Sequence, residues 1–112
     1  MVVRAWRARA TPEGADRYQA HFADAVLGQL RRLQGFRGAC VLRLIDGPEQ
    51  VELEDLTFWE SLQSIHAFAG SDIGKAVVDP IAQTHLLDYD RTVAHYSVEV
   101  DAMPVDAGEA AG

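Results

Sequence analysis

The sequence predicts an α+β domain in which strands and helices follow the order β-α-β-β-α-β. Alternating apolar segments stand near both ends of the chain and on either side of a central turn, and segments with helical spacing separate them. Length agrees, because 112 residues suffice for one domain with a core but not for two. The predicted fold is therefore ferredoxin-like, with a four-stranded antiparallel sheet and helices on one face only.

The first strand is expected over residues 2–10, and one of its faces would carry Val2, Arg4, Trp6 and Ala8. Thr11 and Pro12 then start a helix, because threonine is a good N-cap and proline is tolerated at the first helical position. The helix would run to about residue 33, and Gly35 would cap its end. Its inward stripe, at spacings of three and four, is formed by Tyr18, Phe22, Val26, Leu30 and Leu33.

The middle of the chain predicts a β-hairpin. Asp46-Gly47-Pro48 has the composition of a turn and separates two alternating segments, residues 36–45 and 49–59. In the first segment, alternation places on one face Phe36, Gly38, Cys40, Leu42 and Leu44. In the second, one face mixes polar and aromatic groups, as binding cavities do. That face carries Val51, Leu53, Asp55, Thr57 and Trp59.

The last part of the chain predicts short helices and a closing strand. Ser61 would cap a helix whose inward residues are Leu62, Ile65, Phe68 and Ala69. A further helix would restart at Ser71 and run through Val78, and Pro80 would open a last short one. The closing strand is expected over residues 91–100, with His95 on one face and Tyr96 on the other. The domain would span residues 1–100, and we expect the acidic tail at 101–112 to be disordered.

Composition excludes several classes of function. The net charge is −7 and the arginines are scattered, so the chain lacks the basic face that a nucleic-acid partner requires. The four histidines have no metal-site spacing, so we expect no metal site. A lone cysteine, Cys40, excludes an internal disulfide and favours a reducing compartment. Without a signal peptide or a membrane span, the protein is expected to be cytoplasmic.

The predicted sheet has an uncovered face. Its strands carry apolar and aromatic residues on both faces, whereas helices cover only one of them. The simplest cover for the second face is the same sheet of a second copy. We therefore expect a homodimer with a barrel-like interior.

Short motifs follow one another along residues 2–100: Trp6-Arg7, Ala15-Asp16-Arg17-Tyr18, Gly35-Phe36-Arg37-Gly38, Trp59-Glu60-Ser61, Ile65-His66-Ala67-Phe68-Ala69-Gly70, Pro80 and His95-Tyr96-Ser97-Val98. In this order they resemble the antibiotic biosynthesis monooxygenase (ABM)-like family of dimeric α/β barrels. Its members include quinone-forming monooxygenases, haem-degrading enzymes and many proteins of unknown function. The resemblance therefore implies the fold more specifically than the activity.

The resemblance implies a monooxygenase that works without a bound metal, flavin or other cofactor. Its substrate would be a small phenol or anthrone-like polycycle, whose anion can pass an electron to O₂ by itself. Such a site needs an aromatic slot, a base and donors for the anion. Candidates for the slot and its polar contacts are Trp59, Trp6, Asp55, Tyr18 and Phe68; candidates for the base are His95 and His85; candidates for stabilising the anion are Arg43, Tyr96 and Tyr18.

Other interpretations remain open. Trp59 would be a core residue if it does not line the pocket, Trp6 could lie in the dimer interface, and His95 could be structural. The chain could be a non-catalytic carrier or an auxiliary biosynthetic protein, and cyclisation, isomerisation or decarboxylation would use similar residues. A haem-binding or haem-degrading protein is disfavoured. The resemblance implies a ligand histidine and a first-strand asparagine for that branch, and Val77 and Trp6 occupy those positions, although His66 or His85 could ligate in a different pose.

Overall fold

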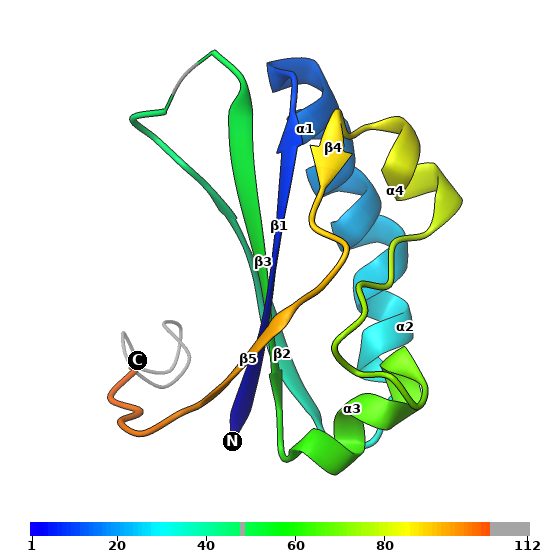
Figure 1. Cartoon of the computed structure of the whole chain (residues 1–112), viewed down its shortest axis with the longest axis vertical. Helices are drawn as coiled ribbons and strands as arrows, with labels where there is room; N and C mark the ends of the chain where they lie inside the picture. Colours follow the sequence, from blue (N-terminus) through cyan, green and yellow to red (C-terminus); the bar gives the residue numbers. More distant parts are fainter. Residues whose placement is uncertain (48, 104–112) are drawn as a thin grey trace, which may run out of the picture.

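The computed structural model describes residues 1–47 and 49–103, in which an antiparallel sheet carries the helices on one face (Figure 1). The sheet is built from β1 (Val2–Ala10), β2 (Phe36–Arg43), β3 (Val51–Trp59), β4 (Asp88–Tyr89) and β5 (Ala94–Ser97). The helices are α1 (Pro12–His21), η1 (Phe22–Val26), α2 (Leu27–Arg31), α3 (Leu62–Ala69) and α4 (Pro80–Thr84). The strand order β2-β3-β1-β4, with β5 also pairing with β1, confirms the ferredoxin-like prediction.

The predicted first helix forms as one continuous segment, but its hydrogen-bonding pattern changes from α-helical to π-helical and back along its length. Thr11 caps it as expected, with its Oγ1 accepting the Gly14 amide at 3.0 Å. A turn of π-helix, η1, then separates α1 from α2. The inserted turn keeps Tyr18, Phe22 and Leu30 on the buried side, so the predicted stripe is confirmed at these three positions.

The predicted face of β2 is wrong beyond its first residue. Phe36 pairs with Trp59 and Gly38 with Phe58, so a bulge at Arg37 shifts the alternation by one residue. Phe36, Ala39 and Val41 therefore pack toward the helices, while Cys40 and Leu42 are exposed. The face predicted for β3 is confirmed, because its residues alternate between buried and half-buried without a break.

Residues 70–79, which we call the cover segment, do not form the helix predicted from Ser71. Their backbone pairs with the chain that follows β4 instead. The Ala76 amide donates to the Arg91 carbonyl, the Val93 amide donates to the Gly74 carbonyl, both at 2.9 Å, and Lys75 forms a bridge with Thr92. The closing strand predicted over residues 91–100 is therefore shortened to β5, because residues 91–93 are bonded to the cover segment rather than to β1. The short strand β4, which precedes this range and also pairs with β1, was not predicted.

Buried side chains lie between the sheet and the helices in two clusters. One contains Ala10, Ala15, Tyr18, Val51, Leu53 and Ala82. The other contains Phe22, Leu30, Trp59 and Ile65. Ser61 caps α3 as predicted, but Leu62 is 48% exposed because it precedes the turn that carries Ile65 inward.

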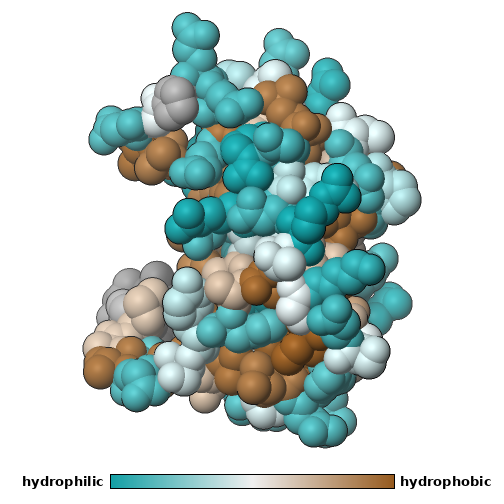
Figure 2. Space-filling view, viewed as in Figure 1, coloured by the Kyte–Doolittle hydropathy of each residue, from teal (hydrophilic) through white to brown (hydrophobic). Residues whose placement is uncertain are grey.

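The second face of the sheet is uncovered in the described part of the chain (Figure 1). Leu42 and Tyr96 on this face are 46% and 60% exposed. Figure 2 shows that the outline of the molecule is hollowed on this side, with apolar residues at both ends of the hollow. Exposed apolar residues of these regions are Leu44, Ile45, Val100 and Met103.

Two further observations concern only residues 1–47 and 49–103. None of their helices has both the length and the apolar composition that crossing a membrane requires. They also contain no group of three or more His, Cys, Asp or Glu side chains placed to hold a metal ion. Of the tail expected at 101–112, residues from 104 onward lie outside the described residues.

Candidate functional site

A cavity of about 60 Å³ lies between the two buried clusters, on the helix side of the sheet. Its aromatic lining comes from four elements and consists of Trp6, Tyr18, Phe22 and Phe68. Its polar lining consists of Arg4, Asp55, Thr57 and Asp79. We call this space the α/β cavity. It is small, since ligand pockets typically measure roughly 300–1,000 Å³.

Asp55 and Tyr18 form a buried pair in this cavity. Tyr18 is carried inward by α1, and its hydroxyl donates to Oδ2 of Asp55 on β3. The Asp55 side chain is 8% exposed, and its Oδ1 has no hydrogen-bond partner among the described residues. Burial raises the pKa of Asp55 to about 7, although the hydrogen bond from Tyr18 acts in the opposite direction. Burial, followed by the charge of Asp55, raises the pKa of Tyr18 far above its ordinary value.

Trp6 stands beside this pair, because it faces Asp55 across β1 and β3. Its indole Nε1 donates to the Asp90 carbonyl at 2.7 Å, which fixes the ring. The ring centroid lies 6.2 Å from that of Tyr18 and 5.9 Å from that of Tyr89. Trp6 is therefore a rigid wall of the α/β cavity rather than a residue of the uncovered sheet face.

Arg4 is a buried cation that the sequence analysis did not single out. It is 4% exposed, and its guanidinium donates to two carbonyls of the cover segment, those of Ile73 and Lys75, the latter at 2.8 Å. Its Nη1 also lies 3.2 Å from Nε2 of His95, and its Cζ lies 5.7 Å from the centre of the Phe68 ring. No carboxylate is hydrogen-bonded to Arg4 within residues 1–47 and 49–103, so its charge is available to an anion in the cavity.

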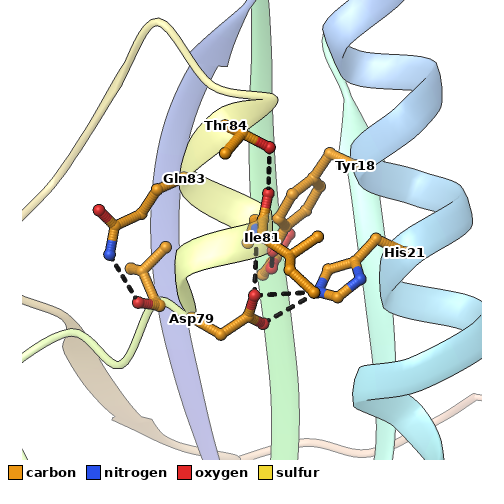
Figure 3. Close-up of polar contacts among 9 residues, drawn as sticks. Tyr18, His21, Asp79, Ile81, Gln83 and Thr84 are labelled. Carbon is orange, nitrogen blue, oxygen red and sulfur yellow. Dashed lines mark hydrogen bonds and ion pairs between the residues drawn. The ribbon is translucent and has the colours of Figure 1, made fainter.

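His21 and Asp79 close one side of the site, where α1 meets α4 (Figure 3). The His21 Nε2 lies 2.9 Å from Oδ2 of Asp79, while Oδ1 accepts the Ala82 amide at 2.8 Å and caps α4. Partial burial alone would raise the pKa of Asp79. The hydrogen bonds from His21 and Ala82 outweigh this effect and lower its pKa below the ordinary range.

The structure gathers four of the site residues expected from the sequence around the α/β cavity: Trp6, Tyr18, Asp55 and Phe68. Trp59 is fully buried under the cavity and supports Phe68, with the two rings stacked at 6.0 Å. Its Nε1 donates to the Thr57 hydroxyl at 2.9 Å, so Trp59 is satisfied within the core.

The other four site residues expected from the sequence lie outside the lining of the α/β cavity. His95 contacts the outer side of Arg4, and both burial and the charge of Arg4 lower its pKa. His85 ends α4 and stacks edge-on with His21 at 6.4 Å. Arg43 pairs with Asp16 at the surface at 2.8 Å. Tyr96 stands on the uncovered sheet face, because residues 95 and 96 alternate along β5.

Comparison with known proteins gives a relationship in fold. No family model and no curated protein matches the sequence. A candidate antibiotic biosynthesis monooxygenase from Bacillus cereus has a TM-score of 0.67 at 17% identity, covering 95% of this chain and 98% of that one. The haem degrader MhuD from Mycobacterium tuberculosis, solved with two haems in its active site, has a TM-score of 0.60 at 22% identity, with coverages of 92% and 100%.

A third similar structure is SnoaB from Streptomyces nogalater, a cofactor-independent oxygenase. Its TM-score is 0.56 at 13% identity, and the match covers 90% of this chain and 96% of that one. These likenesses confirm that the chain has the fold of ABM-like proteins over nearly its whole length. At identities of this size they say nothing of its substrate, because one fold hosts different chemistries.

The α/β cavity does not fit a haem. Among the described residues that line it there is no histidine and no cysteine, and its phenol, Tyr18, is bonded to Asp55. Val77 lines the cavity at the position where the resemblance implied a ligand histidine for the haem-degrading branch.

Proposed function

We propose that the chain is a cofactor-independent monooxygenase that acts on a small, electron-rich hydroxyaromatic molecule, of phenol or anthrone type, in the α/β cavity. The observation that carries this proposal is the meeting of a buried guanidinium and a buried carboxyl on an aromatic-lined cavity. Trp6 and Phe68 would hold the rings by stacking, and Arg4 would face the oxygen that becomes an anion.

The reaction requires ionisation of the substrate before oxidation. Loss of the hydroxyl proton leaves an electron pair on the substrate oxygen, and the resulting anion can transfer one electron to O₂. For an anthrone-type substrate, the balanced result is that a CH₂ group and O₂ give a C=O group and water. The protein must therefore hold the anion and manage protons, which are tasks for Arg4 and a nearby base.

Substrate entry requires the cover segment to move, because the present cavity of about 60 Å³ is too small for fused rings. Val77, Val78 and Asp79 of this segment form part of the lining. Arg4 donates to the carbonyls of Ile73 and Lys75, so lifting the segment would free guanidinium donors. One movement would thus both enlarge the cavity and release the cation that the substrate anion needs.

We also propose that the protein is a homodimer. Exposed apolar side chains on the uncovered sheet face, such as Leu42 and Tyr96, favour a second copy as its cover. In this arrangement the α/β cavity stays within each protomer, since it lies on the opposite side of the sheet.

A carrier without catalytic activity is the main rival. The α/β cavity supports this alternative equally in its apolar lining, since a bound aromatic molecule would meet the same rings whether or not it reacts. The two functions differ in whether O₂ is consumed.

Oxygen uptake by the purified protein tests the proposal. Anthrones and hydroxynaphthalenes would be supplied in chelated buffer, with tryptophan fluorescence recording binding. The proposal expects one O₂ consumed for each product formed, with kcat reduced in Arg4→Lys and unchanged in the surface variant Arg37→Lys, whose partner Glu60 lies 2.6 Å away. Fluorescence quenching without uptake would identify a carrier. A Soret shift with hemin, with no response to the aromatic panel, would favour haem binding.

A further inference from the structure

We propose that Asp55, oriented by Tyr18, is the catalytic base that accepts the proton of the substrate hydroxyl. This inference rests on the oxygenase function proposed above and identifies the proton acceptor of the same site. It assigns the role to a carboxylate on β3 rather than to His95 or His85, which the resemblance had suggested.

The unpaired oxygen of Asp55 is the first argument. Within residues 1–47 and 49–103, Oδ1 of Asp55 is the single buried side-chain nitrogen or oxygen atom without a hydrogen-bond partner. Buried polar atoms are paired in the great majority of cases, so an unpaired one needs an explanation. Because Asp55 lines the α/β cavity, a ligand hydroxyl would supply the missing partner.

Tyr18 explains why only one oxygen is free. Its hydroxyl donates to Oδ2, which leaves Oδ1 as the acceptor for a ligand. Tyr18 is itself 4% exposed and packs against Trp6, so the pair has little freedom to rotate. Burial keeps the tyrosine protonated, and it therefore remains a donor while Asp55 gains and loses its proton. Tyr18 is accordingly a positioning residue.

The charges around Asp55 suit a base that works near neutral pH. The titratable and charged groups near Asp55 come from three elements. Arg4 on β1, Tyr18 on α1 and Asp79 at the start of α4 line the same cavity. Asp79 is in turn paired with His21 of α1. Arg4 is not hydrogen-bonded to Asp55, so burial dominates and raises the pKa of Asp55 to about 7, although the hydrogen bond from Tyr18 acts in the opposite direction. A carboxylate of this strength can take a proton and return it within one turnover.

The histidines are less suitable. His95 lies against Arg4, whose positive charge opposes protonation of the imidazole. The His21 ring is bonded to Asp79, and neither His21 nor His85 is among the residues that line the cavity.

The proton transfer balances without any additional reactant. The substrate O–H bond breaks, a bond forms between the proton and Oδ1 of Asp55, and the electron pair remains on the substrate oxygen. The anion then forms a C–O bond to O₂ at the carbon that carries the remaining hydrogen, and the protonated carboxyl returns its proton to the outer oxygen of this peroxide. When the O–O bond breaks, that oxygen also takes the hydrogen of the carbon and leaves as water, and the carbon becomes C=O. Asp55 is then ready for a second turnover.

Binding of 2-naphthoate, measured by calorimetry, tests the assignment without turnover. This probe is a permanent anion between pH 6 and 9, so it resembles the ionised substrate and should bind only when Asp55 is protonated. The affinity of the wild-type protein should fall about tenfold for each pH unit above the Asp55 pKa. Asp55→Asn should bind with no such dependence, while the surface variant Asp16→Asn should behave as the wild type.

Steady-state oxygen uptake provides the second test. Asp55→Asn keeps the shape and the Tyr18 hydrogen bond but cannot take a proton, so kcat should fall about 10²- to 10⁴-fold with KM changed only a few-fold. Tyr18→Phe removes a hydrogen bond that lowers the pKa of Asp55. In the pH profile of kcat for this variant, the limb on the acid side should therefore move to higher pH. If Asp55→Asn does not fold, the naphthoate profiles of the wild type and Tyr18→Phe still decide.

The outcomes separate this inference from the function on which it rests. Wild-type uptake that Asp55→Asn retains would overturn the role of Asp55 and leave the oxygenase intact. A wild-type affinity for naphthoate that does not change with pH would also overturn the role of Asp55 and leave the oxygenase intact. A wild-type protein that neither binds nor oxidises any aromatic probe would overturn both proposals.

Discussion

Arg4 donates through Nη2 to the carbonyl oxygen of Lys75 at 2.8 Å, which joins the first strand to the cover segment. A second donor, Nη1, reaches the Ile73 carbonyl. The cover segment contains no helix. It is held over the cavity by these bonds, by its pairing with residues 91–93, by the contact of Asp79 with His21, and by the packing of Ile73 and Val78 against the buried clusters. Near Ile73 and Lys75, the stability of the segment should therefore depend on Arg4.

Replacing Arg4 with lysine should loosen the cover segment. Lysine retains the charge but not the planar fork that reaches two carbonyls at once. We expect amide hydrogen exchange within residues 70–79 to accelerate, while exchange in β3 changes little. Mass spectrometry at peptide resolution would measure this. Arg37→Lys is the matched control, because Arg37 pairs with Glu60 at the surface. Unchanged exchange in residues 70–79 would show that the backbone pairing, the Asp79–His21 contact and apolar packing hold the segment without Arg4.

Stability should decline with pH between about 4 and 7 because of Asp55. Its pKa is about 7 in the folded protein and near 3.8 ordinarily, so the folded state binds more protons across this window. The contribution is fully favourable below the ordinary pKa and is lost as pH rises through the folded value. Since one pKa unit corresponds to about 1.4 kcal/mol, the decline is on the order of 4 kcal/mol.

Urea unfolding of wild type and Asp55→Asn at pH 5 and pH 8 would measure the part of this contribution that is lost above pH 5, which is on the order of 3 kcal/mol. The decline should be much smaller in the variant, because asparagine does not titrate. An equal decline in both proteins would mean that Asp55 is ionised throughout and that its burial is relieved by solvent.

The sequence predicted the elements that depend on local chemistry. The Thr11 and Ser61 caps and the buried face of β3 follow from residue type and uninterrupted alternation, and the structure confirms them. The face of β2 was not predicted, because the single signal of the bulge at Arg37 is the neighbouring Gly38, and a glycine inside a strand pattern is compatible with a bulge without fixing the register. One extra residue reverses every later side chain.

The candidate site was predicted only in part, for a related reason. Aromatic and acidic residues on the faces of β1 and β3 indicated a cavity, and Trp6, Tyr18, Asp55 and Phe68 line one. Arg4 was missed because its partners are backbone carbonyls 69 and 71 residues away, which leave no pattern in the side chains. The alternation of the first strand placed Arg4 beside Trp6, and that was the one available signal.

Gly35 should resist substitution far more than Gly28. Gly35 has φ +90°, and a Cβ there would lie 2.4 Å from the Cβ of Ser64 at the start of α3. Gly28 is in α2, with nothing within 4 Å of the added atom. By urea unfolding, Gly35→Ala should lose more than about 1 kcal/mol, and Gly28→Ala should gain roughly 0.5–1 kcal/mol. Equal effects would contradict the close approach of α3 to this turn.

The uncovered sheet face should form the interface of a homodimer. Leu42 is 46% exposed on this face, and a charge placed there would be buried without a partner if a second sheet packs against it. Leu42→Lys should therefore convert a dimer into a monomer at micromolar concentration in light scattering. Ile81→Lys is the matched control, because Ile81 is 59% exposed on α4, on the opposite side of the molecule (Figure 1).

The same pair of variants also separates the interface from the site. The α/β cavity lies on the helix side, so a monomeric Leu42→Lys protein should retain binding of aromatic probes if each protomer holds a complete site. A wild-type monomer would contradict the interface directly. Loss of binding on dissociation, in a variant whose unfolding free energy is unchanged, would show instead that the partner sheet keeps β1 and β3, and with them Arg4 and Asp55, in the geometry that the cavity requires.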